Sequence, residues 1–363
     1  MKRTGLVFAT IAALAACASP VAASASTSPT GAQAAAWTTA EAREVLDALD
    51  AALGGYVFQD KVPAAQGVLQ RNRTAYLAIR DRAEFARRLT EEVGAALDDR
   101  HFYVRERAGS AAVGGGSPAE RAAAEAETGY GIASVRRLPG NIGYLDLRNF
   151  GSSDTAAKRI EAAMDLVQDT GALIIDLRGN RGGGGAAMAA LVGRLSSTPI
   201  PRSVLIWRND DGSEERVPME TREYPPAERY ARPVYVLTSS ITFSAAEAFA
   251  YDVQAAGRVT VVGEATRGGA NPMNRPLVEL GHGLVAFIGN GRSEHPVTKG
   301  TANGVGIQPE VRAASADALS LAYVRALEGV AARDPESRFA RELATARADP
   351  EAALKASFGM TPG

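Results

Sequence analysis

The sequence is poor in the residue types on which several kinds of functional site depend. It contains one cysteine, Cys17, and three histidines in 363 residues. A single cysteine leaves the chain without an internal disulfide, and no His-x-x-x-His or Cys-x-x-Cys spacing supplies a set of zinc ligands. We therefore expect a protein that uses neither a metal nor an organic cofactor.

Excess charge of either sign is also missing. Forty basic and 41 acidic residues leave a net charge of -1, which gives no field that would recruit nucleic acid or an anionic membrane. The glycine-rich run "GNRGGGG" (179–185) is not followed by Gly-Lys-Ser/Thr, so a nucleotide site is weakly supported. The length allows two domains and a substantial core.

The N-terminus has the layout of an export signal. In "MKRTGLVFATIAALAAC" (1–17) a basic start precedes a short apolar core and a small-residue end, too short for a permanent membrane span. Cys17 ends "LAAC", which looks like a bacterial lipobox, and the alternative is ordinary cleavage near "VAASASTS". We expect lipidation of Cys17 and export, giving an anchored lipoprotein that faces the periplasm or the cell exterior.

Four further segments differ in pattern. Residues 18–36 are small and uncharged, as in a flexible tether. Residues 37–107 have apolar positions at three- and four-residue spacings, which predicts a small helical N-terminal domain. Residues 108–127 begin with a Gly/Ser-rich run and predict a linker, and residues 331–363 predict a helical C-terminal tail.

Residues 128–330 alternate short apolar runs with helical stretches. The runs "ALIID" and "VYVL" are continuously hydrophobic, as in strands covered on both faces. Each is followed by a helix-like segment. This pattern predicts an α/β core with a mixed or parallel sheet flanked by helices.

Ser244 stands where the apolar run 232–241 gives way to a helix. With Glu247 three residues later it fits a capping box, in which the serine hydroxyl accepts a backbone N–H. The alternative is a nucleophile with a free amide beside it to receive an oxyanion. A nucleophilic serine needs a base, and no lysine lies between Lys158 and Lys299.

Histidine is therefore the expected base. His101, in "LDDRHFYV", ends a helical run and begins an expected strand, an exit point from which a side chain can face a cleft. His282 and His295 lie in predicted turns. For any single histidine a surface or structural role is the commoner one.

Four segments together carry a family resemblance: "GYGIASVRRLPGNIGYLDLRNF", "ALIIDLRGNRGG", "PVYVLTSSITFSAAEAFAYD" and "VTVVGEATRGGANP". Their order and spacing resemble the tail-specific (C-terminal processing) serine peptidases, in the branch of the tricorn core protease and the interphotoreceptor retinoid-binding protein. The resemblance covers most of residues 37–325. It implies a crotonase-like (ClpP/crotonase) α/β catalytic core preceded by a small helical domain.

The resemblance also implies roles for particular residues. Ser244 falls on the family nucleophile and His101 on the tricorn-type general base. Gly183 and the amide of Ala245 fall on the two oxyanion donors, an arrangement that also makes physical sense.

Three positions depart from the family pattern. Gly269 stands where the tail-specific branch has its lysine, Arg100 replaces a serine before the histidine, and Asn303 stands at the position of the orienting glutamate. Asn303 could still orient an imidazole through its carbonyl oxygen. The alternative is a turn residue in "TANGVG".

These features together predict an exported serine peptidase that cleaves peptides or unfolded protein tails through a Ser–His acyl-enzyme. The main alternative is a catalytically weakened protein of the same fold that binds an apolar ligand or peptide. An acyl-CoA enzyme is a weaker alternative, because CoA substrates are not expected outside the cytoplasm. The sequence gives no indication of the oligomeric state.

Overall fold

The computed structural model describes residues 37–107, 117–195 and 198–359. The predicted signal with Cys17, the tether 18–36 and residues 108–116 of the predicted linker lie outside the described residues. Within the described ranges, no helix is long and apolar enough to cross a membrane.

Residues 37–107 are mainly helical, as the apolar spacing predicts. The elements are α1 (Thr39–Ala52), η1 (Leu53–Gly55), α2 (Val62–Arg71), α3 (Arg73–Ala78) and α4 (Arg82–Leu97). Leu46, Leu49 and Leu89 are fully buried in their common core. Leu280 and Leu284 join the same core, so these helices share it with a segment from late in the chain.

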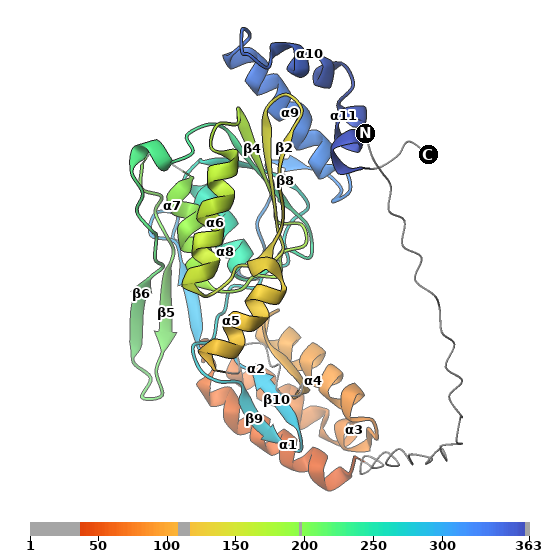
Figure 1. Cartoon of the computed structure of the whole chain (residues 1–363). Coiled ribbons are helices and arrows are strands. Elements are labelled where there is room, and N and C mark those ends of the chain that lie inside the picture. Colours follow the sequence, from red (N-terminus) through yellow and green to blue (C-terminus); the bar gives the residue numbers. More distant parts are fainter. Residues whose placement is uncertain (1–36, 108–116, 196–197, 360–363) are drawn as a thin grey trace, which may run out of the picture. The chain divides into compact units, whose positions relative to one another are not determined.

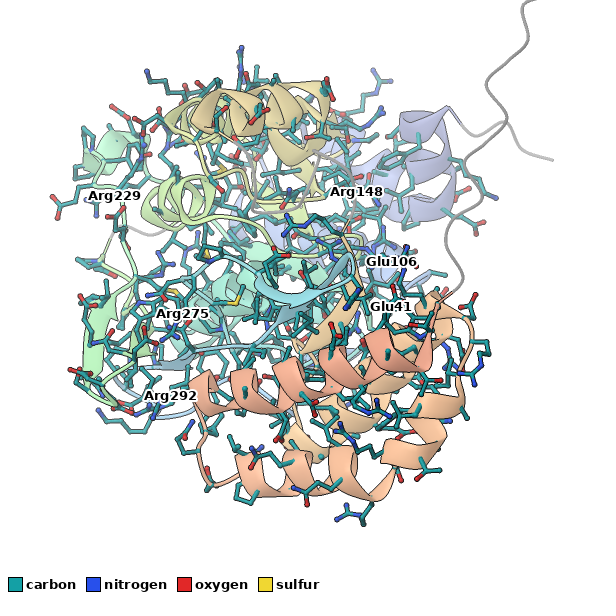
Figure 2. All side chains as sticks on the ribbon, turned by 90° about the horizontal axis from the view of Figure 1, so that it is seen from below. Glu41, Glu106, Arg148, Arg229, Arg275 and Arg292 are labelled. Atoms are coloured by element: carbon teal, nitrogen blue, oxygen red, sulfur yellow. The ribbon has the colours of Figure 1, made fainter. Side chains whose placement is uncertain are left out.

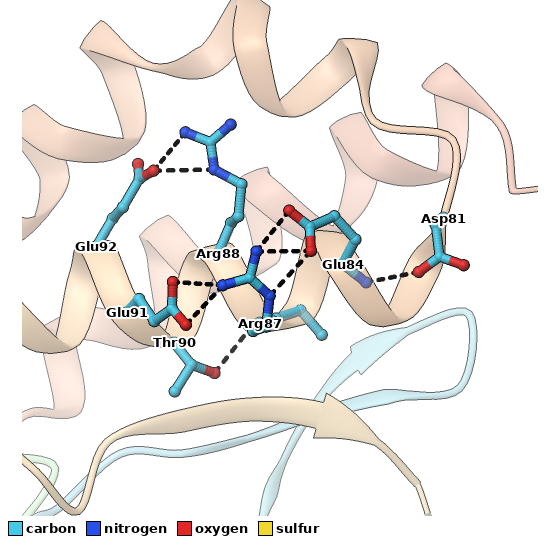
Figure 3. A network of polar contacts seen from close by, with 8 residues as sticks. Asp81, Glu84, Arg87, Arg88, Thr90, Glu91 and Glu92 are labelled. Carbon is cyan, nitrogen blue, oxygen red and sulfur yellow. Dashed lines mark hydrogen bonds and ion pairs between the residues drawn. The ribbon is translucent and has the colours of Figure 1, made fainter.

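The exposed face of α4 carries a network of charged side chains (Figure 3). Asp81 caps the helix by accepting from the Glu84 N–H at 2.7 Å. Arg87 bridges Glu84 and Glu91, each at 2.7 Å. Solvent-exposed ion pairs of this kind stabilise a helix only weakly. Their effect is local: they support the helix that leads into the His101 segment.

A three-stranded antiparallel sheet packs on these helices. It consists of β1 (Tyr103–Glu106), β10 (Leu284–Phe287) and β9 (Val278–Gly281), in the order β1-β10-β9. The Thr90 hydroxyl of α4 accepts from the Val104 N–H at 2.8 Å and donates to the Val104 carbonyl at 2.9 Å. The chain just after His101 is therefore attached to both α4 and β10.

The central sheet has six strands in the order β12-β8-β7-β4-β3-β2. They are β2 (Ile132–Leu138), β3 (Ile142–Leu147), β4 (Ala172–Asp176), β7 (Val234–Thr238), β8 (Val259–Gly263) and β12 (Val311–Arg312). Only the β2–β3 pairing is antiparallel. The predicted mixed sheet of an α/β protein is confirmed.

Helices cover both faces of this sheet (Figure 1). Within β4, Leu173 and Ile175 face a core shared with α6 (Asp154–Val167), α7 (Gly185–Arg194) and α8 (Ala245–Ala255). Ile174 faces a second core with α9 (Ala318–Arg333), α10 (Ala340–Ala348) and α11 (Pro350–Phe358). Alternate residues of a strand point to opposite faces, so β4 is buried on both sides as its continuous hydrophobicity predicts.

A third sheet, in the order β11-β5-β6, forms one wall of the site described below. It comprises β5 (Val204–Arg208), β6 (Glu214–Pro218) and β11 (Gly291–Glu294). Arg275 pairs with Asp210 in the β5–β6 turn at 2.7 Å, and Arg292 pairs with Glu214 of β6. Both arginines lie beside this hairpin in Figure 2. The hairpin is therefore held by charge pairs from two other segments.

The remaining elements are short. They are α5 (Pro118–Glu127), η2 (Gly129–Gly131) and η3 (Pro226–Glu228). Helix α5 lies within the segment predicted as a linker. It has a complete capping box between Ser117 and Glu120 and a proline in its first turn, so a helix begins directly after the glycine run.

Candidate active site

His101 is positioned by the end of α4. The helix stops at Asp98, which has left-handed backbone angles (φ 48°, ψ 47°), and the Asp99 N–H donates to the Gly94 carbonyl at 3.0 Å. The buried Asp99 carboxylate accepts from the His101 N–H at 2.8 Å and from the Tyr56 hydroxyl at 3.0 Å. The backbone at His101 is therefore held from within the helical core.

Ser244 lies in the sharp turn between β7 and α8. Its backbone angles (φ 57°, ψ -122°) lie in a region that non-glycine residues rarely adopt. The Ser244 N–H donates to Glu247 at 2.9 Å, as in a capping box. The Ser244 Oγ, in contrast, lies 3.0 Å from His101 Nε2. The backbone half of the capping box and the contact with histidine therefore coexist.

Glu247 connects the start of α8 to the loop after β8. Besides the Ser244 N–H, its fully buried carboxylate accepts from Thr266 Oγ1 (2.5 Å), Gly268 N–H (2.5 Å) and Gly269 N–H (2.9 Å). Burial raises the pKa of Glu247, whereas the donors favour its charged form. Glu247 thus holds the strained serine turn and the adjacent loop together.

The serine and the histidine open into a cavity of about 420 Å³. Its wall is largely apolar and includes Met188, Leu205 and Met219. Burial lowers the pKa of His101 to about 4; nearby Asp99 opposes this shift and Arg267 adds to it. The imidazole is therefore neutral at pH 7, the state in which a base can accept the serine proton.

Gly183 and Ala245 line the same cavity as Ser244. Phe150 donates to the Gly182 carbonyl at 2.9 Å and accepts from the Gly184 N–H at 2.7 Å, so the amide of Gly183 points to the other side. A Cβ on Gly183 would lie 2.0 Å from the Phe150 carbonyl oxygen, which requires glycine there. Ala245 is the first residue of α8, so its N–H is one of the amides at the positive end of the helix that have no partner within the helix. Gly183, Ala245 and Ser244 all line the cavity.

Among the described residues, none hydrogen-bonds to the second nitrogen of the His101 imidazole. Its Nδ1 is buried and has no hydrogen-bond partner among the described residues. Asn303 Oδ1 instead accepts from the Ala270 N–H at 3.2 Å. The expectation that Asn303 could orient the ring is not met here, because the loop after β8 takes up its carbonyl oxygen.

The other two histidines have structural contacts. His295 is buried, its Nδ1 accepts from the Thr298 N–H at 3.2 Å, and its Nε2 lies 3.3 Å from the Pro201 carbonyl. His282 is paired with Glu44 of α1 at 2.8 Å. His101 is the histidine that reaches the serine, as the sequence context predicts.

Gly269, the position of the family lysine, has no space for a side chain. A Cβ there would lie 2.0 Å from the ring of Phe243. Arg100, the second departure from the family pattern, donates to the carbonyl of Arg267. It therefore ties the His101 segment to the loop that contains Gly269.

Comparison with known families matches this core to one of them. The model of peptidase family S41 matches residues 141–313. The matched residues are fewer than half of the chain, and they identify its core as that of an S41 peptidase. It is a serine-type peptidase, a hydrolase. The match includes Ser244, Ala245, Gly183 and Asn303, whereas His101 precedes it.

The solved structures that match this chain are distant from it in sequence. A candidate peptidase from Parabacteroides merdae ATCC 43184 is 20% identical, with a TM-score of 0.51, 75% of this chain covered and 90% of that chain. The photosystem II D1 C-terminal processing protease is 17% identical (TM-score 0.46, 76% and 94% covered). The tricorn protease is 13% identical (TM-score 0.48, 77% and 35% covered).

The sequence pointed to four residues that the structure brings to one cavity: Ser244, His101, Gly183 and Ala245. It missed the aromatic neighbours of His101. Phe243 lies 4.4 Å from the imidazole centroid, and Phe287 stacks on it at 5.3 Å with an interplanar angle of 17°. Phe243 adjoins Ser244 in sequence, but nothing local to Phe287 indicates its place beside His101.

Proposed function

We propose that this serine peptidase hydrolyses peptide bonds through an acyl-enzyme formed on Ser244, with His101 as its general base. The observation that carries the proposal is the 3.0 Å separation of His101 Nε2 and Ser244 Oγ. A nucleophile and base at hydrogen-bond distance, beside a cavity, are the minimum requirement for acyl transfer.

The chemical steps follow from this pair. Neutral His101 takes the hydroxyl proton as Oγ attacks the scissile carbonyl carbon, and the imidazolium then gives that proton to the departing amine. A water molecule, deprotonated by the same nitrogen, cleaves the ester and restores Ser244. The steps consume one water molecule per peptide bond and need no metal or organic cofactor.

The developing negative charge falls on the former carbonyl oxygen. The amides of Gly183 and Ala245 are the groups we assign to stabilise it. A glycine backbone that admits no Cβ and a helix-start amide can approach the oxygen from two directions. Removal of one such donor in other serine peptidases costs about 10²–10³ in turnover.

The substrate is a peptide or an unfolded segment of protein. Met188, Leu205 and Met219 make one part of the cavity wall apolar, and burial of an apolar side chain contributes about 1.5–3 kcal/mol. We therefore propose that peptides with an apolar residue at the scissile bond are preferred. The S41 family assignment supports peptide and protein substrates.

We also propose export and lipidation at Cys17, supported by the signal-like residues 1–17. The membrane would then be contacted through the lipid. For the fold, we propose the crotonase-like arrangement, supported by parallel strands β3, β4, β7 and β8 with helices packed on both faces.

The test of the proposed function is Ser244→Ala. The variant should lose peptide hydrolysis by several orders of magnitude while remaining folded, because it removes the atom that forms the acyl-enzyme. The measurement is the turnover of a quenched fluorogenic peptide, with circular dichroism and melting temperature as the control for folding. Turnover within severalfold of wild type would refute the assignment and favour a binding protein of this fold.

A further inference from the structure

The imidazole of His101 is held at one nitrogen only. Nε2 faces Ser244, and the buried Nδ1 has no partner among the residues that the structure covers. In serine–histidine sites a third group usually bonds to the second nitrogen and fixes the ring. Both local candidates are engaged elsewhere: Asn303 accepts from Ala270, and Asp99 from the His101 backbone and Tyr56.

Two aromatic rings enclose the imidazole instead. Phe287 of β10 stacks on it with a centroid distance of 5.3 Å and an angle of 17°. Phe243, the residue before Ser244, lies against it at 4.4 Å and 47°. Phe287 is placed there by the β1–β10 pairing, in which it is opposite Tyr103, two residues after His101.

Gly269 makes the space for one of these rings. A Cβ at this position would meet Phe243 at 2.0 Å, so any side chain there displaces the phenyl ring. Arg267, from the same loop, lies over Phe243 at 5.0 Å from the ring centroid. The loop after β8 therefore holds Phe243 in place without itself touching the imidazole through a hydrogen bond.

We propose that Phe243 and Phe287 are positioning residues that hold the His101 imidazole against Ser244 by ring packing, in place of a third hydrogen-bonding side chain. The proposal rests on the proposed Ser244–His101 mechanism. The imidazole lies nearly parallel to the ring of Phe287. If the imidazole rotated, its edge would clash with the Phe287 ring, and close packing resists this rotation. The two phenyl rings thus restrict the orientation in which Nε2 points at Oγ.

The same rings shield His101 from water. Burial is the main cause that lowers the pKa of His101 to about 4. The charged groups that act on the imidazole are Asp99 from its own segment, which raises the pKa, and Arg267 from the loop after β8, which lowers it. Opening one ring face to solvent should therefore bring the pKa back toward 6.5.

The experiment measures kcat, KM and the pH profile of kcat/KM with one quenched fluorogenic peptide. Phe287→Leu and Phe243→Leu should lower kcat by about 10- to 100-fold with little change in KM, because they remove the flat surface but keep an apolar volume. Phe287→Tyr, which keeps the ring, should retain most of the activity. Phe287→Ala should in addition move the acid limb of kcat/KM to higher pH.

Gly269→Ala provides an independent test. Alanine keeps the N–H that donates to Glu247 and adds only a methyl group, which must displace Phe243. Gly269→Ala should lower kcat by the same factor as Phe243→Leu. It therefore tests the role of Phe243 in a chain that keeps this phenylalanine. Wild-type kcat in the folded Gly269→Ala variant would overturn the role of Phe243.

Asn303→Glu separates ring packing from a hidden third residue. It should not raise kcat, because residue 303 bonds to Ala270 and not to the imidazole. A large increase in kcat of Asn303→Glu would overturn the proposal, and so would wild-type kcat and pH profile in both Phe287→Leu and Phe287→Ala. The Ser244→Ala variant tests the proposed function separately. If that function were wrong, Ser244→Ala would retain hydrolysis, whatever the activities of the phenylalanine variants.

Discussion

Ser244 is held in a backbone conformation that costs about 1–3 kcal/mol for a residue with a side chain. Its angles, φ 57° and ψ -122°, persist because neighbouring contacts fix both sides of the turn. The Ser244 N–H is bound by Glu247, and the Phe243 N–H donates to the Asn180 carbonyl at 3.1 Å. In this conformation the Ser244 Oγ lies 3.0 Å from His101 Nε2.

The pKa of His101 leads to a prediction about pH. Because burial lowers it from 6.5 to about 4, the neutral base persists well below neutrality. The value of kcat/KM, which reports the free enzyme, should stay level from pH 7 down to about pH 5 and fall by half near pH 4. An acid limb near pH 6.5 would contradict the burial of the ring.

This measurement needs a control for stability. In the unfolded chain His101 takes up a proton near pH 6.5, whereas in the folded chain it does so only near pH 4. The unfolded state therefore binds more protons between these values, and folding stability falls as the pH is lowered through them. Circular dichroism at each pH shows whether lost activity reflects protonation of a folded enzyme or unfolding.

At the residue scale, the sequence narrows the candidates for nucleophile and base where chemistry restricts the choice. Few histidines and no lysine between 158 and 299 left His101 as the expected base for Ser244, and the two side chains do meet. Asn303 shows the limit: its family position suggested a role at the imidazole, but a single backbone donor, the Ala270 N–H, takes its oxygen. Whether Asn303 Oδ1 accepts from the imidazole or from a backbone N–H depends on the geometry of the loop, which the spacing of residues in the sequence does not determine.

The elements that carry the two reacting groups come from different parts of the chain. His101 follows α4, and Ser244 precedes α8. Arg100 connects them by donating to the Arg267 carbonyl, in the loop whose glycines bind Glu247. The distance between base and nucleophile therefore depends on how α4 and this loop are held together.

Arg100→Ala should loosen that connection. A catalytic base misplaced by about 1 Å lowers the rate by about 10²-fold. The loss of the Arg100 contact should shift His101 by less than this, so we expect kcat to fall by about tenfold or less. The melting temperature should change little, since the side chain is exposed. Arg82→Ala, which breaks an exposed pair with Glu106 elsewhere on α4, is the matched control. Equal kcat in the two variants would show that Arg100 does not position the site.

At the element scale, local and non-local structure differed in how far they could be predicted. Strands β4 and β7 and helix α8 were expected, because continuous apolar runs and helical spacing are properties of the segment itself. The β1-β10-β9 sheet was not expected, because β1 pairs with a strand from much later in the chain. Phe287 was missed for the same reason, since only that pairing brings it to His101.

At the scale of the whole molecule, the helical segment and the sheet contribute complementary parts of one site. The core of α1–α4 extends into β9 and β10, which fixes the histidine side. The cores on the two faces of the central sheet support the turns with Gly183 and Ser244. A peptide in the cavity would contact residues from the central α/β part, the β5–β6 hairpin and the His101 segment.

Export of the whole protein is tested at Cys17. If this residue carries a lipid, the wild-type chain should partition with membranes, and Cys17→Ser should appear in the soluble fraction. The measurement is fractionation of cells that express each form, with Ser244→Ala as a control that leaves Cys17 intact. Identical soluble behaviour of wild type and Cys17→Ser would show that Cys17 is not lipidated.

Reaction with a fluorophosphonate probe, followed by mass spectrometry of the modified peptide, shows directly whether Ser244 is the activated nucleophile. The probe phosphonylates an activated serine, so we predict one label, on Ser244, and much slower labelling of His101→Ala. Ser244→Ala should remain unlabelled. A label on another serine, or none under conditions that modify a control serine peptidase, would contradict the assignment of Ser244 and His101 as nucleophile and base.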